Sequence, residues 1–527
     1  MMAMAAPWRP QRRSCVRGAR FFGGAAASCA IALATLLVSP GTATSNDKRE
    51  PTQVQLGAGL RADPGLAAIW SGSCGEAHAL VGENTSAPGG SGAVAWLRGG
   101  ARGSHGVIDL DRDAGSVRIL AVSRMKGSVG VAAARTVDGG EIFEAYIGSD
   151  CGWGQAGPLL RRLEGLVQPA ATEAVAAAQM VWSNGALHVF VEFKRYADRA
   201  SEILHQTIPA GDVQATVGAV VFDALPQTSS QQRLVSAFAG RGMDEGGAYL
   251  CVSYVSVPTS LIPDGAGGSG SLRLVEVDPD GVVTSDAIAF VGNQVRVFAA
   301  GIVPLVDSRG RPLVILSWDP NSSGRSHVLR ARIEEDGELT VGALPARHWQ
   351  RRHVGQDGNV GFGAIGLSSA AKVIVWRESS PFVRRGLRGR LIAQEIDGHG
   401  RRVELIPLPS RAPKKRWAPF VVGRWGADEA FVAVAARRHG RKLLRLIVLS
   451  DRRSPFVWDE MRFRSLPVPL GATRVTGRGR SRVAVLVRTA GRSVRETLRV
   501  VEFDSEVSGA WVKRELNRLR MGRWRRL

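Results

Sequence analysis

Three aspartates with regular spacing are the first residues in the sequence that could do chemistry. Asp109, Asp111 and Asp113 alternate along the chain, and carboxylates at alternating positions are typical of a calcium-binding loop. An EF-hand loop also needs a glycine at its sixth position and a glutamate at its twelfth. Here Gly115 comes one place late and Leu120 replaces the glutamate. We therefore interpret the aspartates as part of a solvated turn between strands.

A glycine-rich hexapeptide and two histidines are the next candidates. Residues 361–366 read Gly-x-Gly-x-x-Gly, which joins a strand to a helix in dinucleotide-binding proteins. The strand-like segment Lys372–Trp376 follows within six residues, so that interpretation fails. His348 and His353 lie five residues apart without a third ligand nearby, and the chain contains neither His-Glu-x-x-His nor Gly-x-Ser-x-Gly. The sequence predicts no catalytic residue, no metal ligand and no cofactor.

Basic residues outnumber acidic ones, and the excess is confined to the C-terminal part of the chain. The 527 residues include 69 Lys and Arg and 47 Asp and Glu, a net charge of +22. Residues 381–527 hold 35 basic and 13 acidic residues, whereas residues 1–380 hold 34 of each. Such a charge attracts polyanions. The candidate polyanion-binding residues, here termed the basic crescent, are Arg384, Arg385, Lys414, Lys415, Arg416, Arg437, Arg438, Arg441 and Lys442. Solvated loops in an arginine-rich protein are the alternative.

A short β-rich segment recurs eight times and indicates which elements position these residues. The copies are His78–Gly82, Val129–Ala134, His188–Phe193, Tyr249–Tyr254, Leu313–Trp318, Lys372–Trp376, Phe431–Ala436 and Arg482–Arg488. Their centres lie 52 to 64 residues apart. Each copy follows another apolar run across a turn, as Leu187–Val191 follows Met180–Trp182 across an Asn-Gly hairpin signal. Two further runs come after each copy, which gives four short strands per unit.

Four strands per unit and about eight units are typical of a β-propeller. The chain resembles the β-propeller superfamily over residues 50–515, and the resemblance lies in the repeat rather than in a family motif. It implies an all-β fold of eight four-stranded blades, with seven blades or separate β-sandwiches as alternatives. Thr136–Phe143 is similar to the Asp-box of sialidase-type propellers, but Ile142 and Phe143 replace its Thr and Trp. We interpret that segment as a hairpin turn.

The order of strands in a blade predicts which turns lie together. In an up-and-down blade the first and third turns share one end, and the second turn and the link to the next blade share the other. Cys74 falls in the first turn of unit 1 and Cys151 in the third turn of unit 2, at the same end. We predict a disulfide between them, with two free thiols as the alternative, and a buried Cys251. The basic crescent falls at the opposite end, and so do two further basic residues predicted in a loop of the last unit, Arg488 and Arg492.

The two ends of the chain predict export and a charged tail. Residues 1–43 combine a basic start, an apolar run and small residues at a cleavage position, which is typical of a signal peptide. An uncleaved membrane anchor is the alternative. We expect the propeller over residues 44–515 and a basic tail over residues 516–527. The excess of arginine over lysine, 61 to 8, is typical of a GC-rich bacterial genome, and we predict a periplasmic or extracellular location.

Together these features favour an exported, non-enzymatic propeller that binds a ligand or partner through its loop-rich end. The basic crescent favours an anionic glycan or surface, and an unknown protein partner remains open. Export argues against nucleic acid, and we expect a monomer. The alternative function is a glycan-acting hydrolase or lyase on the same scaffold, which requires two carboxylates that converge near the axis.

Overall fold

The computed structural model describes the chain between residues 52 and 504, apart from scattered loop segments. Side chains are described mainly over residues 62–218 and 420–503. The predicted signal peptide and basic tail lie outside the described residues. The chain divides into residues 1–49 and residues 50–527, and all described strands belong to the second unit.

The described strands form eight sheets that follow one another along the chain, and neighbouring strands in each sheet are antiparallel. Blade 1 comprises β2 (Leu60–Ser71), β3 (Ala77–Thr85), β4 (Ala93–Arg98) and β5 (Ser104–Asp109). Blade 2 comprises β6 (Val117–Met125), β7 (Ser128–Val137), β8 (Gly140–Ser149) and β9 (Arg161–Arg162). Blade 3 comprises β10 (Glu173–Ser183), β11 (Ala186–Arg195), β12 (Ser201–Pro209) and β13 (Ala219–Phe222). Blade 4 comprises β14 (Gln231–Ala239), β15 (Ala248–Ser256), β16 (Ser269–Val277) and β17 (Val283–Asn293).

The second half of the unit repeats the same order of strands. Blade 5 comprises β18 (Val295–Val306), β19 (Pro312–Pro320), β20 (Arg325–Ile333) and β21 (Leu339–Ala343), and β22 (Arg351–Arg352) also pairs with β20. Blade 6 comprises β23 (Phe362–Gly366), β24 (Lys372–Arg377), β25 (Leu391–Ile396) and β26 (Arg402–Pro407). Blade 7 comprises β27 (Phe420–Arg424), β28 (Glu429–Arg438), β29 (Arg441–Ser450) and β30 (Arg453–Phe463). Blade 8 comprises β31 (Pro467–Gly477), β32 (Arg480–Ala490), β33 (Glu496–Asp504) and β1 (Thr52–Gln55).

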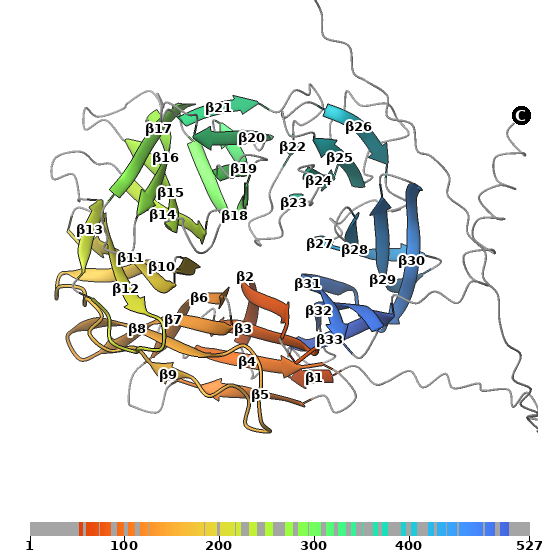
Figure 1. Cartoon of the computed structure of the whole chain (residues 1–527), viewed down its shortest axis with the longest axis horizontal. Helices are drawn as coiled ribbons and strands as arrows, with labels where there is room; N and C mark the ends of the chain where they lie inside the picture. Colours follow the sequence, from red (N-terminus) through yellow and green to blue (C-terminus); the bar gives the residue numbers. More distant parts are fainter. Residues whose placement is uncertain are drawn as a thin grey trace, which may run out of the picture. The chain divides into compact units, whose positions relative to one another are not determined.

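The eight sheets close into a ring, and the N-terminal strand completes the last blade. The first strand of each blade contacts the first strand of the next, and β31 of blade 8 contacts β2 of blade 1 (Figure 1). β1 supplies the fourth strand of blade 8 by pairing with β33, in a register that aligns Thr52 with Val500. The chain is therefore an eight-bladed β-propeller, which confirms the predicted fold class. The closing strand was not predicted from the sequence.

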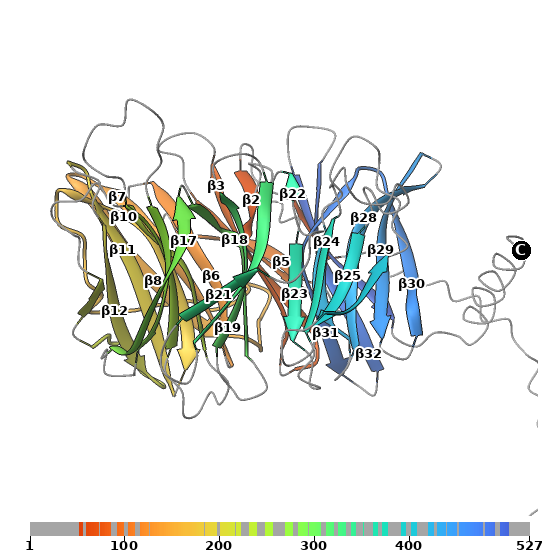
Figure 2. The same ribbon diagram turned by 90° about the horizontal axis from the view of Figure 1, so that it is seen from above.

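Strands in each blade run back and forth between two ends of the ring (Figure 2). The turns after the first and third strands lie at one end, here called the first-turn end. The turns after the second strands lie at the other, here called the second-turn end. This sorting of turns decides which loop residues can act together.

In the blades whose side chains are described, the second strand is buried on both faces, which explains why the repeat is visible in the sequence. In β11 the first eight residues are all buried, and in β7 seven consecutive residues are buried. Blades on either side cover both faces of such strands, so the strands become continuous apolar runs instead of alternating ones. All eight recurring segments predicted from the sequence fall on second strands.

Apolar side chains fill the interfaces between the blades whose side chains are described. Leu80 and Trp96 of blade 1 pack with Val131 of blade 2, and Phe431 of blade 7 packs with Val485 of blade 8. Each fully buried side chain of this size contributes roughly 1.5–3 kcal/mol. Adjacent blades are thus held mainly by hydrophobic contact.

Several predicted turns and strands can be checked directly. Thr136–Phe143 spans the hairpin of β7 and β8, where Gly139 has a positive φ of 96°. Residues 362–366 of the Gly-x-Gly-x-x-Gly segment form strand β23, which pairs with strand β24. A dinucleotide-binding motif would lead into a helix instead. Of the aspartate triplet, Asp109 ends β5 while residues 111–113 lie outside the described residues. No helix in the described part of the chain has the length and apolar character to cross a membrane.

Candidate functional site

The basic crescent is only partly described. Arg384, Arg385, Lys414, Lys415 and Arg416 lie outside the described residues. The other four lie at the predicted second-turn end of blade 7, but on strand ends rather than in a loop. Arg437 and Arg438 end β28, Arg441 and Lys442 begin β29, and Arg438 is paired with Arg441 across the hairpin. Lys442 also donates from Nζ to the backbone oxygen of Arg464 at 2.8 Å, which engages one of the predicted charges.

Arg488 was predicted in a basic loop of the last unit, and that prediction is wrong. It lies inside β32, where its guanidinium is 3.5 Å from the Glu496 carboxylate and donates to the Ala62 backbone oxygen at 3.0 Å. Because Ala62 belongs to blade 1, Arg488 connects the last blade to the first. The charge of Arg488 therefore contributes to ring closure. Arg492 lies outside the described residues.

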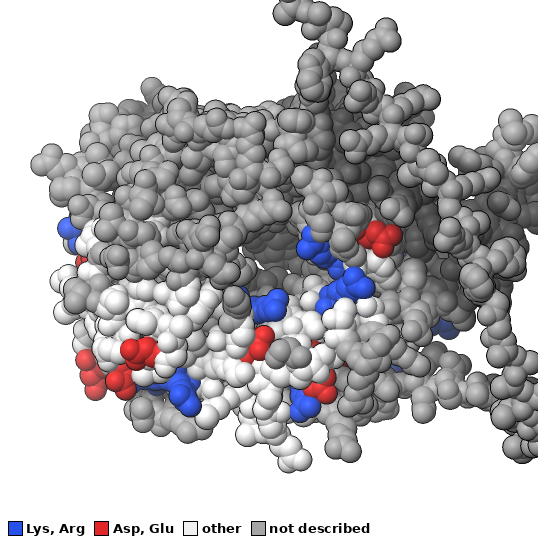
Figure 3. Space-filling view, in the orientation of Figure 1, with Lys and Arg blue, Asp and Glu red and all other residues white. Residues whose placement is uncertain are grey.

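Three exposed arginines lie instead on innermost strands at the first-turn end. Arg124 is near the end of β6, Arg424 ends β27 and Arg474 is near the end of β31. These are the first strands of blades 2, 7 and 8. Basic side chains border the hollow between the inner strands on the face seen in Figure 3. We call Arg124, Arg424 and Arg474 the arginine rim.

The signal for the arginine rim is present in the sequence but easy to miss. Each arginine falls near the end of the first apolar run of its unit, just before the first turn. Basic residues in loops are the more obvious candidates, because loops are the usual recognition sites. In a propeller the ends of the innermost strands surround the axis, so short strand ends also come together there. Arg474 is oriented by Ser481, whose hydroxyl lies 2.9 Å from its Nη2.

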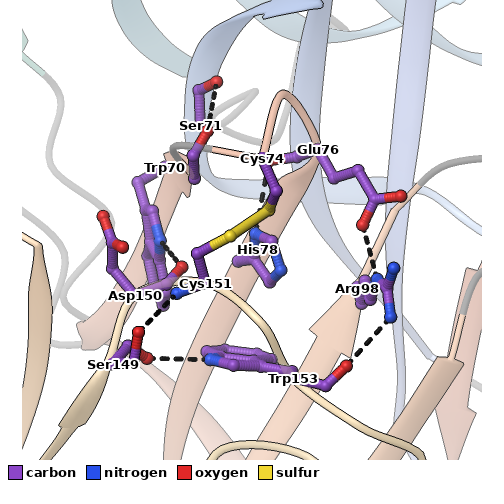
Figure 4. The surroundings of a disulfide bond; sticks show 11 residues. Trp70, Ser71, Cys74, Glu76, His78, Arg98, Ser149, Asp150, Cys151 and Trp153 are labelled. Carbon is purple, nitrogen blue, oxygen red and sulfur yellow. Dashed lines mark hydrogen bonds and ion pairs between the residues drawn. A yellow bond between two sulfur atoms is a disulfide. The ribbon is translucent and has the colours of Figure 1, made fainter.

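A disulfide joins neighbouring blades at the same end. Cys74 follows β2 and Cys151 follows β8, and their Cα atoms are 6.2 Å apart in the disulfide (Figure 4). This is the pair that the turn positions predict. Trp70 and Trp153 pack edge to face beside the disulfide with ring centroids 5.5 Å apart, and His78 lies 4.7 Å from Trp153. The aromatic rings fix the two loops around the sulfur atoms.

Polar groups around the disulfide are ordered by specific contacts. Arg98 forms an ion pair with Glu76 and donates to the backbone oxygen of Trp153 at 2.9 Å (Figure 4). His78 is fully buried, and its Nδ1 lies 3.3 Å from the Glu76 backbone oxygen. Burial lowers the pKa of His78 below its usual value, with smaller opposing effects from the Glu76 contacts. The imidazole is therefore neutral at neutral pH.

One carboxyl group is buried without a partner near the second-turn end. Glu83 lies near the end of β3, has no exposed surface, and neither carboxyl oxygen has a hydrogen-bond partner. Burial, with repulsion from Glu496, raises the pKa of Glu83 to about 8. The side chain is thus an uncharged acid at neutral pH. Because it is sealed from solvent, it cannot act on a ligand in this arrangement.

Two buried histidines are paired inside blade 3. The Nδ1 of His188 lies 2.9 Å from the Nε2 of His205, and neither residue has more than 1% exposed surface. Burial, with repulsion from His188, lowers the pKa of His205 to about 3. Phe190 stacks on His205 with ring centroids 4.8 Å apart. Both histidines are structural groups, and protonation of His205 opposes folding.

Acidification is therefore expected to destabilise the protein through His205. The folded-state pKa is depressed, so the unfolded chain takes up the proton first, and stability is lost as pH falls below about 6.5. By pH 5 this one group costs on the order of 2 kcal/mol. Urea unfolding of the natural protein and His205→Gln at pH 7 and pH 5 measures it. The loss of stability between pH 7 and pH 5 should be smaller in His205→Gln than in the natural protein. It should persist in the control His105→Gln, which changes an exposed histidine. Equal losses in the natural protein and both variants would contradict a role for His205.

No protein-family model matches the sequence, and no curated protein matches it. Among solved structures, a Trypanosoma rangeli sialidase in complex with sialic acid is similar, with a TM-score of 0.37 and 10% identity over 86% of this chain. The chain spans 59% of that sialidase. The β-propeller domain of the Trilobed protease from Pyrococcus furiosus has a TM-score of 0.36 and 9% identity over 74% of this chain and 96% of its own. A mutant of AofleA from Arthrobotrys oligospora has a TM-score of 0.35 and 10% identity, over 68% and 89% of the two chains. Similarity this low carries no information on ligand or activity, and the propeller assignment rests on the strand pairing of this chain.

Proposed function

We propose that this protein is an exported, non-enzymatic β-propeller that binds an anionic ligand at the arginine rim. The observation that supports it most is the position of Arg124, Arg424 and Arg474 near the first-turn ends of three innermost strands of a closed ring. Guanidinium groups form charge-assisted, two-pronged contacts with carboxylates, sulfates and phosphates. An acidic glycan or an anionic surface supplies such groups in a repeated array, and the excess of basic residues favours its approach.

The ring suits binding better than catalysis in the part of the chain with described side chains. Glycan hydrolysis needs two carboxyl groups that reach the substrate. The close acidic pair here, Glu83 and Glu496, has one member fully buried and the other held by Arg488. This pair serves the junction of blades 8 and 1 and offers no acid to a ligand.

Two matched sets of substitutions test where an anionic ligand binds. The first set replaces the arginine rim with Gln at Arg124, Arg424 and Arg474. The second replaces Arg437, Arg438 and Arg441 with Gln at the second-turn end. Both remove three positive charges, so their effects on net charge are equal. With heparin as the probe, we expect the first set to weaken binding by about 100-fold, because three charge-assisted contacts are lost.

The second set is expected to change heparin affinity by less than about threefold, since charges at the opposite end of the ring are screened at physiological salt. Equal losses in the two sets would show that net charge alone drives binding. A loss confined to the second set would move the ligand to the second-turn end. Either result would overturn the arginine rim as the binding site. Circular dichroism and thermal melting of both sets would verify that the ring remains folded.

A further inference from the structure

The loop that carries Cys74 also brings together three side chains that can ligate a metal ion. Cys74, Glu76 and His78 each offer a ligand atom, and these atoms all lie within 4.8 Å of one another. The residues are spaced by two along the turn that leads into β3, where Gly75 has a positive φ of 71°. Sulfur, nitrogen and carboxylate oxygen together are the donor set of zinc sites.

His78 is prepared for ligation by its surroundings. It is fully buried, and its Nε2 has no hydrogen-bond partner. A buried imidazole nitrogen without a partner is costly, and metal coordination is one way to recover that cost.

The disulfide controls whether the third ligand is available. While Cys74 is bonded to Cys151 its sulfur cannot act as a thiolate ligand. A dithiol reductant transfers two electrons and two protons to the S–S bond, which yields two thiols and leaves the reductant as a disulfide. Cys74 is exposed, so a reductant can reach it.

We propose that reduction of the Cys74–Cys151 disulfide creates a binding site for a zinc-like divalent cation, with Cys74, Glu76 and His78 as protein ligands. The Cys74 thiol releases its proton to solvent as the cation binds. The fourth position is taken by water or by the sulfur of Cys151, which adjoins Cys74 in the oxidised form. Arg98 forms an ion pair with Oε2 of Glu76, which orients the carboxylate beside Cys74 and His78. This site is independent of the arginine rim.

Two serine variants that break the same disulfide provide a matched test. Cys151→Ser frees Cys74 and keeps all three ligands, whereas Cys74→Ser frees Cys151 and removes one ligand. Zn²⁺ affinity of the full chain is measured by competition with a chromophoric chelator. We expect Cys151→Ser to bind one additional Zn²⁺ per chain without reductant, and Cys74→Ser to bind it at least about 100-fold more weakly. Other cysteines are common to both variants and cancel in the comparison.

The natural protein gives a second measurement that needs no substitution. Oxidised protein is expected to bind no Zn²⁺ at this site, and reduced protein is expected to bind it and to regain part of the thermal stability that reduction removes. Adding His78→Asn to Cys151→Ser should abolish the extra binding. Equal Zn²⁺ affinities for Cys151→Ser and Cys74→Ser, or no Zn²⁺ uptake by the reduced natural protein, would overturn the proposal.

Discussion

Replacing Cys74 and Cys151 together with serine is expected to lower the free energy of unfolding by about 4 kcal/mol. The disulfide closes a loop across a sequence separation of 77 residues, so the unfolded chain gains much freedom when the bond is absent. The bond also connects the loops of blades 1 and 2 beside the packed Trp70 and Trp153 rings. Its removal loosens that interface in addition to the entropy effect.

Urea unfolding with and without a dithiol reductant measures this contribution. The natural protein should lose stability on reduction. The double serine variant should have the unfolding free energy of the reduced protein, with or without reductant. Cys251 remains in both and acts as the internal control for thiol effects elsewhere. If the double variant is as stable as the oxidised natural protein, the disulfide does not stabilise the propeller.

Replacing Glu83 with Gln is expected to stabilise the protein at alkaline pH. The folded-state pKa of Glu83 is raised to about 8 against a usual value of 4.5. Stability from this group is therefore fully present below pH 4.5 and is lost as pH rises toward 8, because only the unfolded chain ionises. Between pH 5 and 7.5 the loss amounts to about 3 kcal/mol. Gln has nearly the same shape and cannot ionise, so it removes this loss.

The measurement compares the variant with the natural protein at pH 5 and pH 7.5 by urea unfolding. The difference in unfolding free energy should shift by about 3 kcal/mol in favour of Glu83→Gln as pH rises. Glu144 is the matched control, because it is also buried but is 3.1 Å from Arg135 and 2.9 Å from Arg162. Glu144→Gln should destabilise the protein at both pH values. A pH-independent effect of Glu83→Gln would show that this carboxyl group is ionised in the fold.

Much of the fold could be predicted because the strongest pattern in the chain marks one structural position. Second strands such as β11 are covered on both faces, so their apolar runs stand out against Gly-rich and Asn-Gly turns. The number of blades followed from counting these runs. The Cys74–Cys151 pair followed from knowing which turns share an end. Both inferences need only the order of strands.

Other features depend on contacts between residues that are far apart in the chain. The closing strand Thr52–Gln55 has four residues and gains its partner only when β33 reaches it. The sequence places Arg488 in a loop, because its hydrogen-bond partner, the backbone oxygen of Ala62, lies in the first blade and cannot be recognised from local sequence. Glu83 occupies an ordinary strand end in the sequence, and Glu496, which repels its charge, belongs to blade 8 at the other end of the chain. The closing strand, the Arg488 contact and the surroundings of Glu83 all depend on closure of the ring.

The arginine rim was missed for a related reason. Arg124, Arg424 and Arg474 are scattered along the chain, and no local spacing relates them. Their common feature is a position near the first-turn end of a first strand, and that feature has meaning only in a closed ring. The basic crescent was favoured because its residues cluster in sequence. Clustering in sequence and a shared position near the axis are different properties, and the proposed binding site depends on the second one.

Binding of the full chain to an array of acidic polysaccharides, neutral glycans and anionic lipid vesicles, at low and at physiological salt, tests the central claim most directly. We expect binding to anionic members only, with affinity that falls steeply as salt rises, because guanidinium contacts with sulfates, carboxylates or phosphates are screened. The arginine rim variant on the same array should lose that binding. Binding to neutral glycans that is indifferent to salt, or no binding to any anionic member, would contradict an anion-binding propeller.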